Sequence, residues 1–115
     1  MKEAVKLFTI LIEEMNKICS DNDCKLVIIN LPIKMQFDKS FLDNENFDSL
    51  KIQKILKNVT SENNIPLIDL YIPINNSKNP LDYYLDWDFH LSKEGHKLVG
   101  DELYKFLVND NFLIK

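Results

Sequence analysis

The feature that most constrains the fold is the alternation of helix-like segments with two short, predominantly apolar runs. The first run covers residues 25–31 (Lys-Leu-Val-Ile-Ile-Asn-Leu) and is stopped by Pro32. The second covers residues 65–70 (Ile-Pro-Leu-Ile-Asp-Leu), with its proline near the start, where a strand tolerates one. Continuous apolar runs are typical of parallel strands that are buried on both faces.

Three segments with helical periodicity surround these runs. In residues 3–19, apolar side chains recur at three- and four-residue steps and spread widely, which predicts a helix covered on more than one side. A second helix is expected over residues 47–62, and a third follows Ser92, a good N-cap residue. Residues 34–46 and 71–91 have no clear periodicity, and we expect loops there; the second is long for a structureless connection.

The order strand, helix, strand predicts a right-handed crossover between parallel strands in an α/β protein. We expect residues 1–115 to form a single domain, because no repeat or linker divides them. Two strands and three helices make up about half of an open α/β sheet, and a sheet normally has more strands than two. We therefore expect a missing N-terminal segment, a second copy of the chain or another protein to complete it.

Charge and composition exclude several classes of protein. The 115 residues carry a net charge of −4, which argues against a nucleic-acid partner. No apolar run is long enough to span a membrane. The N-terminus lacks the apolar core of a signal peptide, so a cytoplasmic location is favoured. Cys19 and Cys24 are then expected to be reduced, although their spacing also permits a disulfide in an oxidising compartment.

The segment from Asp86 to His96 (Asp-Trp-Asp-Phe-His-Leu-Ser-Lys-Glu-Gly-His) concentrates the groups suited to catalysis. Imidazole titrates near neutral pH, and a neighbouring carboxylate can fix its tautomer. We expect a carboxylate oxygen of Asp88 to lie within hydrogen-bond reach of the His90 ring, with Asp86 as the reserve acid. Trp87 and Phe89 alternate with these polar residues and are expected to pack on the opposite side.

Other interpretations of the same residues remain open. His90 can be a loop histidine bonded to the backbone, and Asp88 a residue that caps the turn. Asp86, Asp88 and His90, joined by His96, also form a possible set of metal ligands, although their spacing matches no specific metal signature. No serine of the chain lies in a glycine-rich or nucleophile-elbow context.

Three segments, residues 25–32, 65–71 and 88–99, resemble the C-terminal half of SGNH (GDSL-type) hydrolases. The specific part is Asp-x-His-Leu-Ser-x-x-Gly-His, which begins at Asp88. The resemblance implies a three-layer α/β/α, flavodoxin-like fold with part of a parallel sheet. It also implies esterase, lipase or O-acyl transfer chemistry on an ester- or acyl-bearing small molecule or glycan. His90 would be the general base and Asp88 its orienting acid, and no cofactor or metal is expected.

The chain departs from this family where the nucleophile belongs. It has two glycines, Gly95 and Gly100, and neither a Gly-Asp-Ser block nor a Gly-x-Asn-Asp block. The resemblance therefore implies the C-terminal part of such a domain, inactive alone because the serine nucleophile is absent. The alternative is a non-catalytic α/β remnant or interaction module that is completed by a partner or a second copy.

Overall fold

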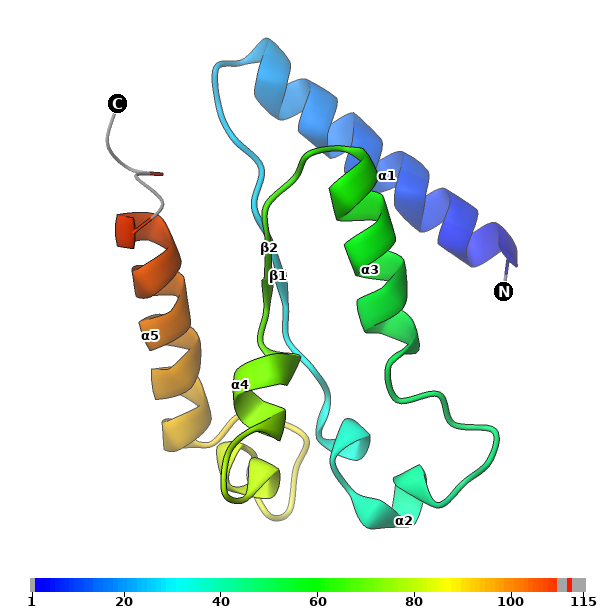
Figure 1. The fold of residues 1–115 in the computed structure, drawn as a ribbon, viewed down its shortest axis with the longest axis vertical. Coiled ribbons are helices and arrows are strands. Elements are labelled where there is room, and N and C mark those ends of the chain that lie inside the picture. The colour runs from blue at the N-terminus through cyan, green and yellow to red at the C-terminus, as the bar shows by residue number, and fades with distance from the viewer. Residues whose placement is uncertain (1, 110–111, 113–115) are drawn as a thin grey trace. The chain divides into compact units, whose positions relative to one another are not determined.

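Helices and two short strands alternate along the chain, which confirms the α/β class. The computed structural model describes residues 2–109 and 112. Its elements are α1 (Lys2–Asp21), β1 (Ile28–Asn30), η1 (Lys34–Gln36), α2 (Lys39–Leu42), α3 (Lys51–Glu62), β2 (Leu67–Asp69), α4 (Tyr71–Asn75), η2 (Pro80–Tyr83) and α5 (Lys93–Asn109), where η marks a 3₁₀-helix (Figure 1). None of the helices described has the length and apolarity needed to cross a bilayer.

The chain packs as two compact units, and the division falls within both strands. The first unit contains Lys2 to Ile29 and Leu50 to Leu67. The second contains Asn30 to Ser49 and the described residues from Ile68 onward. Each unit has its own buried residues.

The two strands are neighbours in a sheet, as the apolar runs predict. The backbone N–H of Ile28 donates to the carbonyl of Pro66 at 3.0 Å, and that of Leu70 donates to Asn30 at 3.1 Å. Both strands advance in the same direction along this ladder, so the pair is parallel. Each strand is only three residues long, shorter than its apolar run. A sheet of two such short strands does not confirm the expected three-layer, flavodoxin-like arrangement.

The first unit is built around α1, α3 and the residues that lead into the strands. Ile12, Val59 and Ile65 are buried together, with partly buried neighbours Leu26, Ile28 and Ile55 packed against them. The prediction that α1 is covered on more than one side is wrong. Ile12 is its one buried residue among those described, because α3 and the strand residues contact a single face of the helix.

The helices of the first unit end where the polar clusters predict. Asp23 and Asn64 adopt left-handed backbone conformations, with φ of 54° and 53°, which Asn and Asp tolerate better than most residues. The start of α3 differs from the prediction, since the helix begins at Lys51 rather than near Phe47. A turn replaces the expected first helical residues, with the N–H of Phe47 donating to the carbonyl of Asn44.

The second unit has more local structure than the sequence predicts. Leu70 and Ile74 are each 1% exposed, and the ring of Phe37 stacks on that of Tyr71 with centroids 5.2 Å apart. The prediction of a structureless loop over residues 71–91 is wrong, because this stretch contains α4, η2 and a β-bridge. Pro73 does not prevent α4, since it lies in the first turn, where a helix needs no donated N–H.

Candidate functional site

The candidate catalytic pair, Asp88 and His90 (the dyad), lies on a closed loop immediately before α5. This dyad loop covers residues 84–91. The backbones of Tyr84 and Leu91 form an antiparallel bridge at the two ends of the loop. Within it, the N–H of Leu85 donates to the carbonyl of His90 at 2.9 Å, and that of Asp88 donates to the carbonyl of Leu85 at 3.4 Å. The loop is therefore held at its ends and by a tight inner turn.

Ser92 caps α5 and ties it to η2, as the Ser-x-x-Gly sequence suggests. Its hydroxyl accepts a hydrogen bond from the N–H of Gly95 at 3.1 Å and donates one to the carbonyl of Asp82 at 2.7 Å. The predicted N-cap is confirmed, and it satisfies one of the donors that a helix start leaves unpaired. The backbone N–H of Ser92 also donates to the carbonyl of Tyr83 at 2.9 Å.

Gly95 permits this close approach between α5 and η2. A β-carbon at Gly95 would overlap the carbonyl oxygen of Tyr83 and lie 3.1 Å from the β-carbon of Leu91. Gly95 is thus needed because no side chain fits between α5 and η2. Its backbone conformation does not require glycine, since no glycine described has a positive φ. The loop that carries the dyad is seated on the first turn of α5 through this contact.

Asp88 and His90 form the predicted pair. An Asp88 carboxylate oxygen, Oδ2, lies 2.7 Å from Nδ1 of His90, and its other oxygen accepts a hydrogen bond from the N–H of Phe89 at 2.5 Å. The hydrogen bond from His90, followed by that from Phe89, holds the pKa of Asp88 below its usual range. The His90 side chain is 81% exposed, so solvent screens the pairing.

The geometry indicates which ring nitrogen is available for chemistry. A carboxylate accepts only, so the neutral His90 ring places its proton on Nδ1 and leaves the lone pair on Nε2. Nothing in the part of the chain that the structure describes hydrogen-bonds to Nε2. A general base in an acyl-transfer site has this arrangement, with one nitrogen oriented by a carboxylate and the other able to take a proton.

Asp88, and not the reserve candidate Asp86, is the acid that pairs with His90. Asp86 contributes through its backbone, whose carbonyl accepts a hydrogen bond from Nζ of Lys34 at 3.0 Å. The same ammonium donates to the carbonyl of Leu85 at 2.6 Å. Lys34 therefore clamps the loop from η1. Sequence reasoning missed this residue because about fifty positions separate the two segments.

A second tie to the same segment is buried. The Tyr84 hydroxyl donates to the carbonyl of Pro32 at 2.7 Å, and the side chain is 3% exposed. Burial raises the pKa of Tyr84 well above its ordinary value. The buried phenol of Tyr84 and the ammonium of Lys34 therefore both hold the start of the dyad loop in place.

The aromatic residues of the loop are exposed, so the prediction that they pack is wrong. Trp87 is 82% exposed and Phe89 is 64% exposed. The residues form a turn rather than an extended strand, and the two-sided alternation of a strand does not apply. Both side chains line a shallow depression of about 240 Å³ that also includes Asp88 and Lys34.

The geometry gives no support to the metal interpretation. Over residues 2–109 and 112, no three His, Cys, Asp or Glu side chains are grouped to hold an ion, and His96 lies exposed on α5.

Cys19 and Cys24 are both free, with the Cys24 thiol donating to the carbonyl of Cys19 at 3.2 Å. The hydrogen bond with Cys24 raises the pKa of Cys19.

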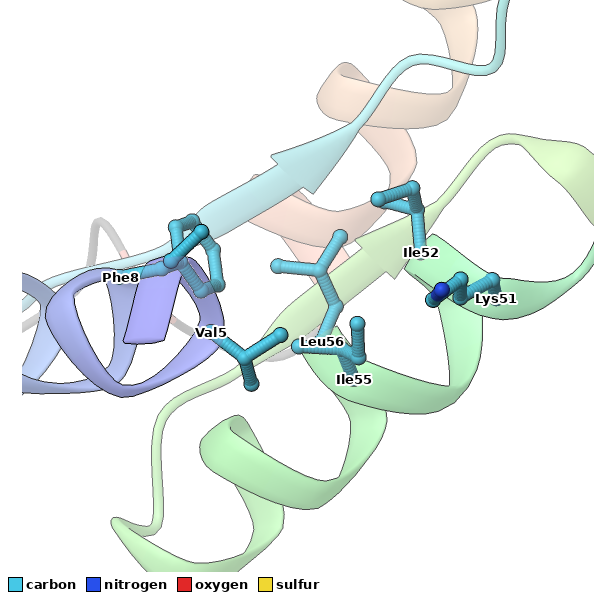
Figure 2. A pocket seen from close by; sticks show the side chains of 7 residues that line it. Val5, Phe8, Lys51, Ile52, Ile55 and Leu56 are labelled. Carbon is cyan, nitrogen blue, oxygen red and sulfur yellow. The ribbon is translucent and has the colours of Figure 1, made fainter. Parts of the chain in front are cut away.

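A second concave feature belongs to the first unit. An apolar groove of about 340 Å³ runs between the start of α1 and the start of α3. Figure 2 shows Phe8 and Val5 on one wall and Ile52, Ile55 and Leu56 on the other. Aliphatic and aromatic carbon atoms line most of this groove. Such a lining suits the binding of an apolar group rather than catalysis.

Comparison with known proteins gave no match: no protein-family model, no curated protein and no solved structure corresponds to this chain. The resemblance to SGNH hydrolases therefore rests on its motif residues alone.

Proposed function

We propose that this chain supplies the acid–base half of an acyl-transfer site of SGNH type. In this proposal His90 is the general base and Asp88 the carboxylate that orients it. The substrate is an ester or another O-acyl compound, carried by a small molecule or a glycan. The serine nucleophile and the oxyanion donors come from a segment or partner outside these residues.

The observation that carries the proposal is the 2.7 Å contact between Asp88 Oδ2 and His90 Nδ1, which leaves Nε2 exposed to solvent. During attack on the ester carbonyl, Nε2 would take the proton from the serine hydroxyl and then give it to the departing alkoxide. The acyl group would pass to water or to an acceptor hydroxyl, with the same nitrogen activating the incoming oxygen.

The exposure of the dyad is consistent with an incomplete site. A working base needs a nucleophile beside it and donors aimed at the oxyanion. Among the described residues, no serine or cysteine hydrogen-bonds to His90, and the nearby Ser92 hydroxyl is engaged in the N-cap. We propose that the missing part also adds strands to the two-stranded sheet and completes a three-layer α/β/α architecture.

Aryl acetate hydrolysis tests this proposal. We expect the isolated chain to hydrolyse 4-nitrophenyl acetate no faster than its His90→Ala variant. Co-expression with the segment encoded immediately upstream should give turnover that His90→Ala abolishes and that the matched control His96→Ala retains. A serine-directed fluorophosphonate should then label the added segment. Turnover that survives His90→Ala, or labelling of a serine in this chain, would contradict the proposed roles.

The alternative function is an interaction module without catalysis. The two-stranded sheet favours it, since sheets of this size are marginal without further strands. If the upstream segment binds and orders the chain but no His90-dependent turnover appears, the module explains the chain better than the hydrolase does.

A further inference from the structure

Helix α1 exposes an apolar stripe that its own unit does not cover. Leu7, Leu11, Met15 and Ile18 are 58%, 53%, 48% and 60% exposed, and their spacing of four, four and three residues places them along one face. The face that packs toward α3 carries Val5 and the buried Ile12. Phe8, which lines the groove of Figure 2, lies between that face and the stripe, so the stripe borders the groove and is separate from the buried core.

The residues that border this stripe have an unusual order of charge. Glu3, Lys6, Ile10, Glu14 and Lys17 run along one side of it, and all five are exposed. Glu3 and Lys17 each lie seven residues from Ile10, and Lys6 and Glu14 each lie four residues from it. The positions in the row are therefore symmetric about Ile10, and residues at equal distances on its two sides carry opposite charges.

We propose that α1 pairs antiparallel with α1 of a second copy of this chain, with the two Ile10 residues near the twofold axis. In this register Glu3 faces Lys17 of the other copy, and Lys6 faces its Glu14. Symmetry doubles each contact, which gives four opposite-charge pairs around the joined apolar stripes. A parallel, in-register pair would instead place each charge against its own copy, which is unfavourable.

The charges on the same helix do not prevent this pairing. Lys17 already contacts Asp21 at 2.6 Å within α1, but both side chains are largely exposed. A lysine ammonium carries three donors, so it can serve Asp21 and Glu3 of the other copy together. The negative charge of Glu13 lies farther around the helix, away from the stripe.

The size of the surface predicts a weak dimer. The paired rows run from Glu3 to Lys17, which is 14 residue steps or roughly 21 Å of helix at about 1.5 Å per step. One helix face is smaller than the ~800 Å² per partner that stable complexes bury. We therefore expect a dissociation constant in the micromolar range or weaker, and a dimer that salt weakens because its bordering charges are exposed.

Sedimentation velocity of the full chain tests the pairing. Wild type should dimerise with rising concentration, and less so in 0.5 M salt. Lys17→Glu and Glu3→Lys should each weaken dimerisation about tenfold, since each turns two attractive contacts into repulsive ones. The double variant Glu3→Lys/Lys17→Glu should regain the wild-type constant. Lys57→Glu, the same charge change on an exposed residue of α3, serves as the matched control and should have no effect.

Cross-linking tests the orientation in a background without the native thiols (Cys19→Ser/Cys24→Ser). A mixture of Glu3→Cys and Lys17→Cys chains should oxidise to a mixed dimer, and Glu3→Cys alone should not. The proposal is overturned by a chain that stays monomeric up to millimolar concentration, by a double variant no better than the single ones, or by efficient self-linking of Glu3→Cys. Circular dichroism of each variant confirms that the helix is folded.

Discussion

The two glycines of α5 offer a matched pair of substitutions with opposite expected effects. Gly95 lies in the first turn against the carbonyl oxygen of Tyr83, whereas a β-carbon at Gly100 would meet no atom within 4 Å. Both positions are helical, so Ala gains intrinsic helix propensity at each, by up to about 1 kcal/mol. The difference between the two variants therefore measures the steric contact at Gly95.

At Gly95 the steric term should dominate. Forcing a methyl group into a packed site costs about 1–3 kcal/mol, and here the obstructing atom belongs to the backbone, which cannot rotate away. After a helical gain of up to about 1 kcal/mol is subtracted, Gly95→Ala should lower the free energy of unfolding by up to about 2 kcal/mol. Gly100→Ala should raise it by about 0.5–1 kcal/mol.

Urea denaturation followed by circular dichroism at 222 nm measures both changes. NMR of the His90 ring should in addition show a chemical-shift change in Gly95→Ala and none in Gly100→Ala, because the dyad loop is seated on the contact with Gly95. If Gly95→Ala is as stable as the wild type, or if the two variants shift stability in the same direction, α5 does not approach η2 as closely as described.

Three further outcomes follow from the contacts of the loop. His90→Gln should bring the pKa of Asp88 up toward its usual range in an NMR carboxyl titration. The depressed pKa of Asp88 stabilises the fold above its ordinary titration range, and this contribution is lost as pH falls through the depressed value, so the acid limb of the stability profile should flatten in the variant. Lys34→Met should raise amide exchange rates at Leu85 and Asp86 several-fold without unfolding the chain; unchanged exchange would show that the ammonium does not clamp the loop. Tyr84→Phe should cost about 1–2 kcal/mol, because it leaves a buried carbonyl without its donor, and a urea midpoint equal to that of the wild type would contradict this.

The features that sequence reasoning predicted correctly are local ones. The pairing of Asp88 with His90 joins residues two positions apart, and the Ser92 cap acts within one helical turn. The parallel strand pair was also predicted, because a helix between two apolar runs allows little else. For the dyad and the cap, a few neighbouring residues contain the whole physical cause; for the strand pair, the connection rule for parallel strands supplies the long-range part.

The features that it missed depend on distant partners or on turn geometry. Lys34 and the loop it clamps are about fifty residues apart, and no pattern in the sequence joins them. The exposure of Trp87 follows from a turn where an extended segment was assumed. For α1, periodicity revealed the apolar residues but not how many neighbours would cover them.

The solvent exposure of Trp87 also determines what tryptophan fluorescence can report about this protein. It is the only tryptophan of the chain and is 82% exposed in the folded state. Its emission should therefore change little on unfolding, and fluorescence melts would underestimate the transition. The same property makes it a sensitive reporter of occupancy: any molecule that covers the dyad loop should shift the emission to shorter wavelength and protect the indole from iodide quenching.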